Sequence, residues 1–193
     1  MVNKIIVPIC LFFLAGTVIA DFQAGGEAYK QGDYETAAKE FLPLAEAGDH
    51  RAMYALGSMY SAGNGVPQDY AEALKWFQKA AKYGRPDAEY KIGLLYLNGL
   101  GTEKDYRKAI NWFGRSAQKG YPSAQYRIGQ MYAEGWGVQP DDVKAYAWLI
   151  TALAQGSTEA KPDLETVRGR LNPEQLNEAE SLSQSYRDKY VRH

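Results

Sequence analysis

Ser116 and Lys119 have the S-x-x-K spacing that surrounds the nucleophile of penicillin-recognising serine enzymes. Those enzymes also carry an S-D-N and a K-T-G element, and this sequence contains neither. Alanine stands 36 residues before and after Ser116, at Ala80 and Ala152. The pattern therefore favours a small core residue near the end of a helix over a nucleophile.

Other residues that are able to do chemistry lack the partners that the chemistry needs. The two histidines, His50 and His193, are far apart, whereas a zinc site needs three or four nitrogen or sulfur ligands. The glycine-rich run 99–102 lacks the G-K-[ST] ending of a phosphate-binding loop. Asp141 and Asp142 are typical of a helix start. We therefore predict no catalytic residue, no metal and no cofactor.

The charge balance excludes one large class of partner. The 193 residues include 22 basic and 23 acidic side chains, which gives a formal net charge of −1. Nucleic-acid-binding proteins usually carry a basic patch or stripe, and we find no run of like charges here. The sequence therefore predicts no nucleic-acid partner.

The first twenty residues have the features of a secretory signal peptide. Lys4 precedes an apolar run of about fifteen residues, and modest side chains lead to Ala20. The alternative, a membrane anchor, is disfavoured because a spanning helix needs about 20 apolar residues. Cys10 does not fit a lipid-attachment site because the preceding Ile9 is large. We predict cleavage after Ala20, which places the protein in the periplasm or outside the cell.

Cleavage at that point changes the chemistry of the remaining chain. It removes the only cysteine, so the mature protein has no thiol and no disulfide. It also removes one basic residue, which changes the formal charge from −1 to −2. We expect no membrane insertion of the mature chain and favour a monomer, although the sequence leaves the oligomeric state open.

A period of 36 residues organises most of the chain. It defines three units, 49–84, 85–120 and 121–156, and the first two are identical at 13 of 36 positions where chance gives about two. Glycine, tyrosine and tryptophan recur in step, and these are the predicted core positions: Gly57, Tyr60, Trp76, Gly93, Tyr96, Trp112, Gly129, Tyr132 and Trp148. A fixed period of this size is typical of a solenoid of stacked supersecondary units.

Each unit has the pattern of two helices. Apolar residues at spacings of three and four predict a first helix, which ends at Gly63 or its equivalent, and a second glycine follows two positions later. The second helix is predicted to start at Asp69 or its equivalent, and Asp69 with Glu72 has the spacing of a capping box. Glycine inside the first helix, as at Gly57, suggests a close approach between helices.

Shorter segments flank the three units. Residues 21–48 have the positions of a plain helical hairpin and are predicted to cap the N-terminal end. Residues 157–193 contain two amphipathic stripes, and Asn172, Pro173 and Gln175 have the features of a helix start. We predict that this segment covers the C-terminal end of one solenoid domain.

The run from Ala52 to Gly84 resembles the Sel-one-like repeat (SLR), a relative of the tetratricopeptide repeat with a longer Gly-Gly loop. The resemblance covers about 49–156 and implies an all-α right-handed solenoid of helix-turn-helix repeats with terminal capping helices. It also implies a bacterial secreted protein that acts as an adaptor or scaffold. Some secreted members are linked to β-lactamase activity, but they carry a cysteine pair in each repeat, so we do not extend that activity to this chain.

The resemblance places the first helices along a concave face. We therefore predict a non-catalytic adaptor of the cell envelope that binds a protein or peptide on that face; a secreted hydrolase of cell-wall or β-lactam substrates is the alternative. The candidate partner-binding residues are Met53, Tyr54, Glu89, Tyr90, Lys91, Gln125, Tyr126, Arg127 and Gln130. Lys91 and Arg127 are suited to an acidic group or a peptide carboxylate. The sequence leaves open whether the three tyrosines lie in the core or in the groove.

Overall fold

The computed structural model describes residues 21–190, which form ten helices and no strand. The helices are α1 (Phe22–Lys30), α2 (Tyr34–Glu46), α3 (His50–Ala62), α4 (Tyr70–Ala81), α5 (Pro86–Asn98), α6 (Tyr106–Ala117), α7 (Pro122–Glu134), α8 (Asp142–Ala154), α9 (Ala160–Arg168) and α10 (Pro173–Tyr190). The predicted signal peptide, with Cys10, and His193 lie outside the described residues.

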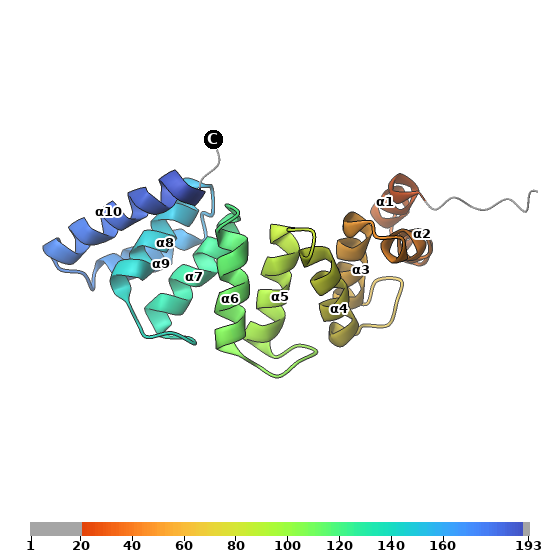
Figure 1. Cartoon of the computed structure of the whole chain (residues 1–193), viewed down its shortest axis with the longest axis horizontal. Helices are drawn as coiled ribbons and strands as arrows, with labels where there is room; N and C mark the ends of the chain where they lie inside the picture. The colour runs from red at the N-terminus through yellow and green to blue at the C-terminus, as the bar shows by residue number, and fades with distance from the viewer. Residues whose placement is uncertain (1–20, 191–193) are drawn as a thin grey trace, which may run out of the picture.

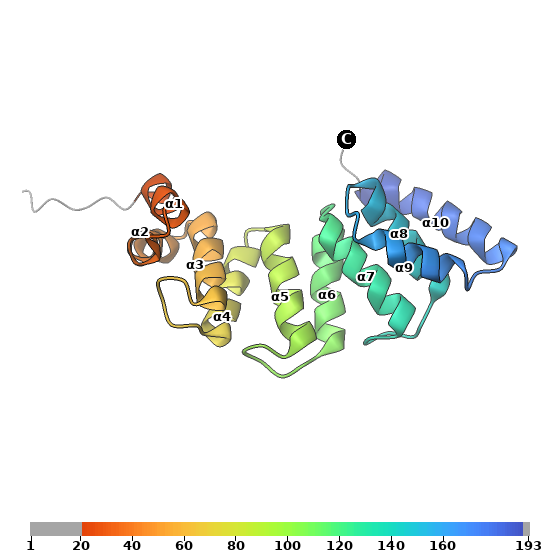
Figure 2. The ribbon, with the colours of Figure 1, turned by 180° about the vertical axis from the view of Figure 1, so that it is seen from behind.

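The helices form hairpins that follow one another along a curved row (Figure 1). The hairpins α3/α4, α5/α6 and α7/α8 correspond to the three 36-residue units, and each second helix packs against the first helix of the next hairpin. The view from behind shows α1 and α2 at one end of the row and α9 and α10 at the other (Figure 2). This arrangement confirms the predicted helical solenoid.

The two glycines of each loop have different roles. Gly63 ends α3 in the left-handed conformation, with φ of 74°, and its equivalents do the same. Gly65 also has a positive φ, but a Cβ atom there would overlap the backbone carbonyl of Tyr34, at the start of the preceding second helix. The second glycine therefore allows contact between neighbouring units, which the sequence pattern alone did not indicate.

Aspartate begins each second helix, as predicted. The side chain of Asp69 accepts hydrogen bonds from the amides of Ala71 and Glu72, and its own amide donates to the carbonyl of Tyr60 at 2.9 Å. The carboxylate of Glu72 pairs with Lys75 and does not accept from the amide of Asp69, so only half of the predicted capping box forms. The same amide-to-carbonyl bond links Asp105 to Tyr96 and Asp141 to Tyr132, so the recurring tyrosine also closes the loop.

Recurring glycines and aromatic rings bring the two helices of a hairpin together. A Cβ atom at Gly57 would lie 2.7 Å from the ring of Phe77, which is why the helix tolerates a glycine there. Trp76 and Trp148 are buried, as predicted. Trp112 packs against the core but is only partly buried, and the guanidinium of Arg115 lies over its indole, 4.3 Å from the ring centre. Trp112 therefore lies at the edge of the core and not inside it.

The C-terminal helices cover the last repeat. Asn172 and Gln175 exchange side-chain-to-amide hydrogen bonds of 2.9 and 3.1 Å, which forms the predicted capping box of α10. α10 packs on α8, where Tyr186 stacks on Trp148 with ring centres 4.3 Å apart. Burial raises the pKa of Tyr186 to about 12. These contacts protect the apolar end of the stack from water.

Candidate binding surface

The first helices of the hairpins, α1, α3, α5 and α7, follow one another along the row (Figure 2), and we call the side of the protein that they present the first-helix face. Tyr54, Tyr90 and Tyr126 are half-buried on it. The rings of Tyr54 and Tyr90 each pack against a core phenylalanine of their own hairpin, with centres 5.6 Å apart. The tyrosines therefore belong both to the edge of the core and to the surface.

Three of the predicted binding residues are not available to a partner. Met53, Glu89 and Gln125, which occupy equivalent positions in the three units, are all buried. The sequence pattern placed them on the open face, but the structure buries all three side chains. The prediction that they contact a partner is corrected accordingly.

The polar members of this buried set find partners inside the protein. Glu89 accepts a 3.0 Å bond from Nε of Arg115 and a 2.6 Å bond from Nζ of Lys119. One unit later, Nε2 of Gln155 donates to Oε1 of Gln125 at 2.5 Å. Each pair is separated by 30 residues, so an ion pair in one unit and an amide pair in the next occupy the same place.

The remaining predicted residues do not form one site. Nη1 of Arg127 donates to Oε1 of Gln130 at 2.8 Å, and its guanidinium lies over the ring of Tyr126. Gln130 in turn donates to Asp163 of α9, so both residues are engaged in a network at the C-terminal end. Lys91 is half-buried in α5 and belongs to no ion pair among residues 21–190.

A hollow of about 560 Å³ opens on the first-helix face at its N-terminal end. Its walls come mainly from α1 and α3, and they combine aromatic rings with basic groups and contain no acidic side chain. We call this space the N-terminal hollow; its lining residues are Phe22, Gly26, Tyr29, Lys30, Phe41, Arg51, Tyr54, Ala55, Ser58 and Arg85. Tyr54 is the one predicted binding residue among them.

Arg51 is held at one side of the hollow by its neighbours. Its Nε and Nη2 atoms donate to the two carboxylate oxygens of Asp49 at 3.1 and 2.6 Å. The guanidinium lies 4.4 Å from the ring centre of Phe22, which is close enough for a cation–π interaction. The hydrogen bond from Arg51 lowers the pKa of Asp49 to about 2, so the pair remains intact at mildly acidic pH.

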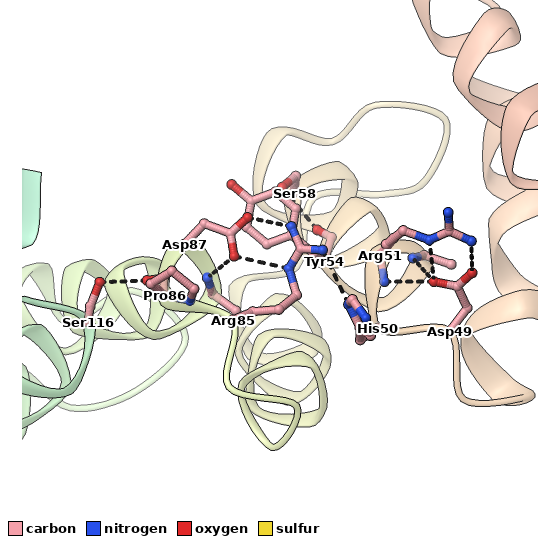
Figure 3. A network of polar contacts seen from close by, with 11 residues as sticks. Asp49, His50, Arg51, Tyr54, Ser58, Arg85, Pro86, Asp87 and Ser116 are labelled. Carbon is pink, nitrogen blue, oxygen red and sulfur yellow. Dashed lines mark hydrogen bonds and ion pairs between the residues drawn. The ribbon is translucent and has the colours of Figure 1, made fainter. Parts of the chain in front are cut away.

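Arg85 has a similar arrangement on the next unit (Figure 3). Its Nε and Nη2 atoms donate to Asp87 at 3.0 and 2.5 Å, and Nη1 lies 3.3 Å from Nδ1 of His50. The guanidinium also lies 4.9 Å from the ring centre of Tyr54. Two arginines, each paired with an aspartate, therefore lie beside one aromatic hollow.

The sequence contains a signal for this arrangement, a charge pair that is inverted between two units, which the search for repeats did not identify. Asp49 and Arg51 stand at the first and third positions of one unit, and Arg85 and Asp87 stand at the same positions of the next in reversed order. The third unit has Tyr121 at the first of these positions. A charge pair that is inverted between repeats is not explained by the repeat core, which makes it a marker of specialisation.

The structure offers little support for catalysis at Ser116. Its side chain is fully buried, and its hydroxyl donates to the carbonyl of Pro86 at 2.6 Å. Over residues 21–190, no group of three or more metal-ligating side chains comes together. In the same range, no helix combines the length and the apolar character needed to cross a bilayer.

Comparison with known proteins places this geometry in a family. The family model described as Sel1 repeat matches residues 50–84, 86–121 and 122–157. A Sel1 repeat protein from Oxalobacter formigenes is 28% identical with a TM-score of 0.69, over 75% of this chain and 58% of that chain. The protein c5321, a protective antigen of uropathogenic Escherichia coli strains with an SLR fold, is 27% identical with a TM-score of 0.63, over 88% of this chain and 45% of that chain.

The chain therefore spans about half the length of these two solved structures. No curated protein sequence matches it. The three matched segments together cover more than half of the chain and coincide with the three hairpins of the solenoid. On this basis, the protein belongs to the Sel1 repeat family.

Proposed function

We propose that this protein is an exported, non-catalytic scaffold of the bacterial cell envelope that binds a protein or peptide partner on its first-helix face. Sel1 repeat proteins are generally protein-interaction scaffolds. A rigid solenoid offers a partner a large, pre-formed surface, and little conformational entropy is lost when that surface is occupied.

The N-terminal hollow is the observation that carries this proposal. Binding sites are usually concave and largely apolar, with a few fixed polar groups that give specificity. The hollow has that composition, because its aromatic walls are accompanied by Arg51 and Arg85, each held by an aspartate. No comparable observation favours the alternative of a secreted hydrolase, because the hydroxyl of Ser116 is buried and donates a hydrogen bond to the carbonyl of Pro86.

Export is supported by the start of α1. Asp21 caps this helix by accepting a hydrogen bond from the amide of Gln23, so cleavage after Ala20 leaves the helix and its cap complete. The amide nitrogen of Asp21 also lies 3.2 Å from a carboxylate oxygen of Glu40, where a new terminal ammonium group is stabilised. The mass of the protein isolated from the periplasm or the medium tests this, and a chain that begins at Asp21 is expected.

A photo-crosslinking experiment tests the binding proposal. A benzoylphenylalanine side chain at Lys91, on the first-helix face, is expected to trap one partner as a discrete adduct in cells. The same group at Asn111, which is exposed on the second helix α6, is the matched control and is expected to trap none. Equal adducts at both positions, or an adduct at Asn111 alone, contradict the proposal.

A further inference from the structure

We propose that the N-terminal hollow binds the free carboxyl end of a partner protein whose last residue has a large apolar side chain. This inference rests on the proposed binding function and specifies the ligand of one part of the first-helix face. The carboxylate is recognised by Arg51 and Arg85, and the apolar side chain enters the aromatic interior.

The charges around the hollow select an anion. Three basic residues line it, and the acidic residues that pair with them, Glu27, Asp49 and Asp87, lie outside the lining. Asp49 engages only the Nε and Nη2 edge of Arg51, and among residues 21–190 its Nη1 atom makes no hydrogen bond. An arginine oriented by one carboxylate still has donors for a second one, and charge-assisted bonds of this kind are among the strongest in proteins.

The apolar interior selects what accompanies the anion. Phe22 and Phe41 face each other with ring centres 5.3 Å apart, and Tyr54 forms a further part of the wall. Filling this space with a large side chain removes apolar surface from water, which favours binding. A polar ligand such as inorganic phosphate gains nothing from these walls, so the hollow is poorly suited to it.

A chain terminus satisfies both requirements with one residue. Its carboxylate is attached to the same carbon as its side chain, so the rim and the interior are filled together. An internal aspartate or glutamate uses its own side chain as the carboxylate, so the same residue has no apolar side chain to place in the hollow. Capture of a terminal carboxylate is also an established mode of peptide recognition.

Peptide titration tests this proposal with the purified protein. The probe is a fluorescein-labelled pentapeptide, Gly-Ser-Gly-Ala-Phe, with a free carboxyl end, and binding is followed by fluorescence anisotropy. Conversion of the end to an amide is expected to weaken binding at least about tenfold, because charge-assisted bonds are lost. Replacement of the last residue by glycine is expected to weaken it similarly.

Paired variants separate the guanidinium groups from the net charge. Asp49→Asn with Arg51→Gln, and Arg85→Gln with Asp87→Asn, each remove one cation and one anion. Each is expected to weaken binding of the free-acid peptide toward the affinity of the amide peptide while leaving binding of the amide peptide unchanged. The matched control, Asp105→Asn with Lys108→Gln, removes the ion pair at the N-terminal end of α6 and is expected to change neither.

Several results overturn the inference. They are equal affinity for the acid and amide peptides, unchanged acid binding in the paired variants, no binding of any peptide, and equal binding of an amidated peptide with an internal glutamate. The crosslink at Lys91 is an independent readout. If it persists while the peptides fail, the carboxyl-end proposal is wrong and the scaffold function still stands; loss of both contradicts both.

Discussion

The buried pair of Glu89 and Lys119 allows one repeat to be redesigned on the model of the next. Glu89 is 0% exposed and accepts from Lys119 at 2.6 Å, whereas Gln125 and Gln155 form an amide pair in the same place one unit later. The double change Glu89→Gln with Lys119→Gln copies the amide pair into the middle unit. We therefore expect the double variant to lose less stability than the sum of the losses in the two single variants.

The magnitudes follow from which group is left buried. Lys119→Gln removes one of the two cations from a carboxylate that has no access to water, and a hydrogen bond to a charged group contributes about 1.5–3 kcal/mol. Glu89→Gln leaves Arg115 and Lys119, whose side chains are 52% and 32% exposed and are able to turn toward water. We expect that change to cost about 1 kcal/mol. The double variant is expected to cost about 1 kcal/mol as well, so the coupling between the two positions is roughly 2 kcal/mol.

Urea unfolding of the four proteins measures this cycle. At equal m-value, the midpoint is expected to fall for Lys119→Gln and to recover in the double variant. In thermal unfolding, the single change is expected to lower Tm by roughly 3–12 °C for a chain of this size. A double variant that loses the sum of the single effects, or a neutral Lys119→Gln, refutes the reasoning.

Three further predictions concern the loops, the core and the pH dependence. Gly65→Ala is expected to destabilise the protein by more than about 1 kcal/mol, because Gly65 has a positive φ and a Cβ atom there would overlap the backbone of Tyr34. Gly114→Ala, in open space within α6, is expected to stabilise the protein by up to about 1 kcal/mol. Urea midpoints of the two variants that shift in the same direction contradict this prediction. Trp148 is 8% exposed, and Trp148→Ala is expected to lower the free energy of unfolding by about 3–5 kcal/mol. Trp112 is only partly buried, so Trp112→Ala is expected to cost about half as much. Equal losses of stability in calorimetry count against this difference in burial. The pKa of Asp49 is lowered from 3.8 to about 2, so its negative charge stabilises the fold above pH 4 and this contribution is lost as the pH falls to about 2. The difference in Tm between the wild type and Asp49→Asn is therefore expected to disappear between about pH 4 and about pH 2. A difference that stays constant over this range refutes the assignment.

Local rules predicted most of the fold from the sequence. Gly63 and Asp69 ended and began helices as expected, because left-handed backbone and amide capping depend on few neighbours. Glu72 was misjudged because Lys75, one turn later, competes for its carboxylate. Trp112 packs against the core but is only partly buried, and the repeat pattern does not distinguish it from Trp76, which is buried.

The candidate site was harder to predict than the fold. The position of Glu89 holds a different residue in each unit, and for that reason it was assigned to the open face. A buried position also differs between units when its partner changes with it, as in the pairs of Glu89 with Lys119 and of Gln125 with Gln155. The N-terminal hollow depends on how α1 packs beside α3, and α1 lies outside the 36-residue repeat. The inverted pairs of Asp49 with Arg51 and Arg85 with Asp87 were the available signal.

Hydrogen exchange of the protein with and without the partner trapped at Lys91 tests the central claim most directly. Binding on the first-helix face predicts that amides of α1, α3, α5 and α7 become protected, while those of α4 and α6 exchange as before. Protection confined to α4 and α6, or no change in any first helix, contradicts it.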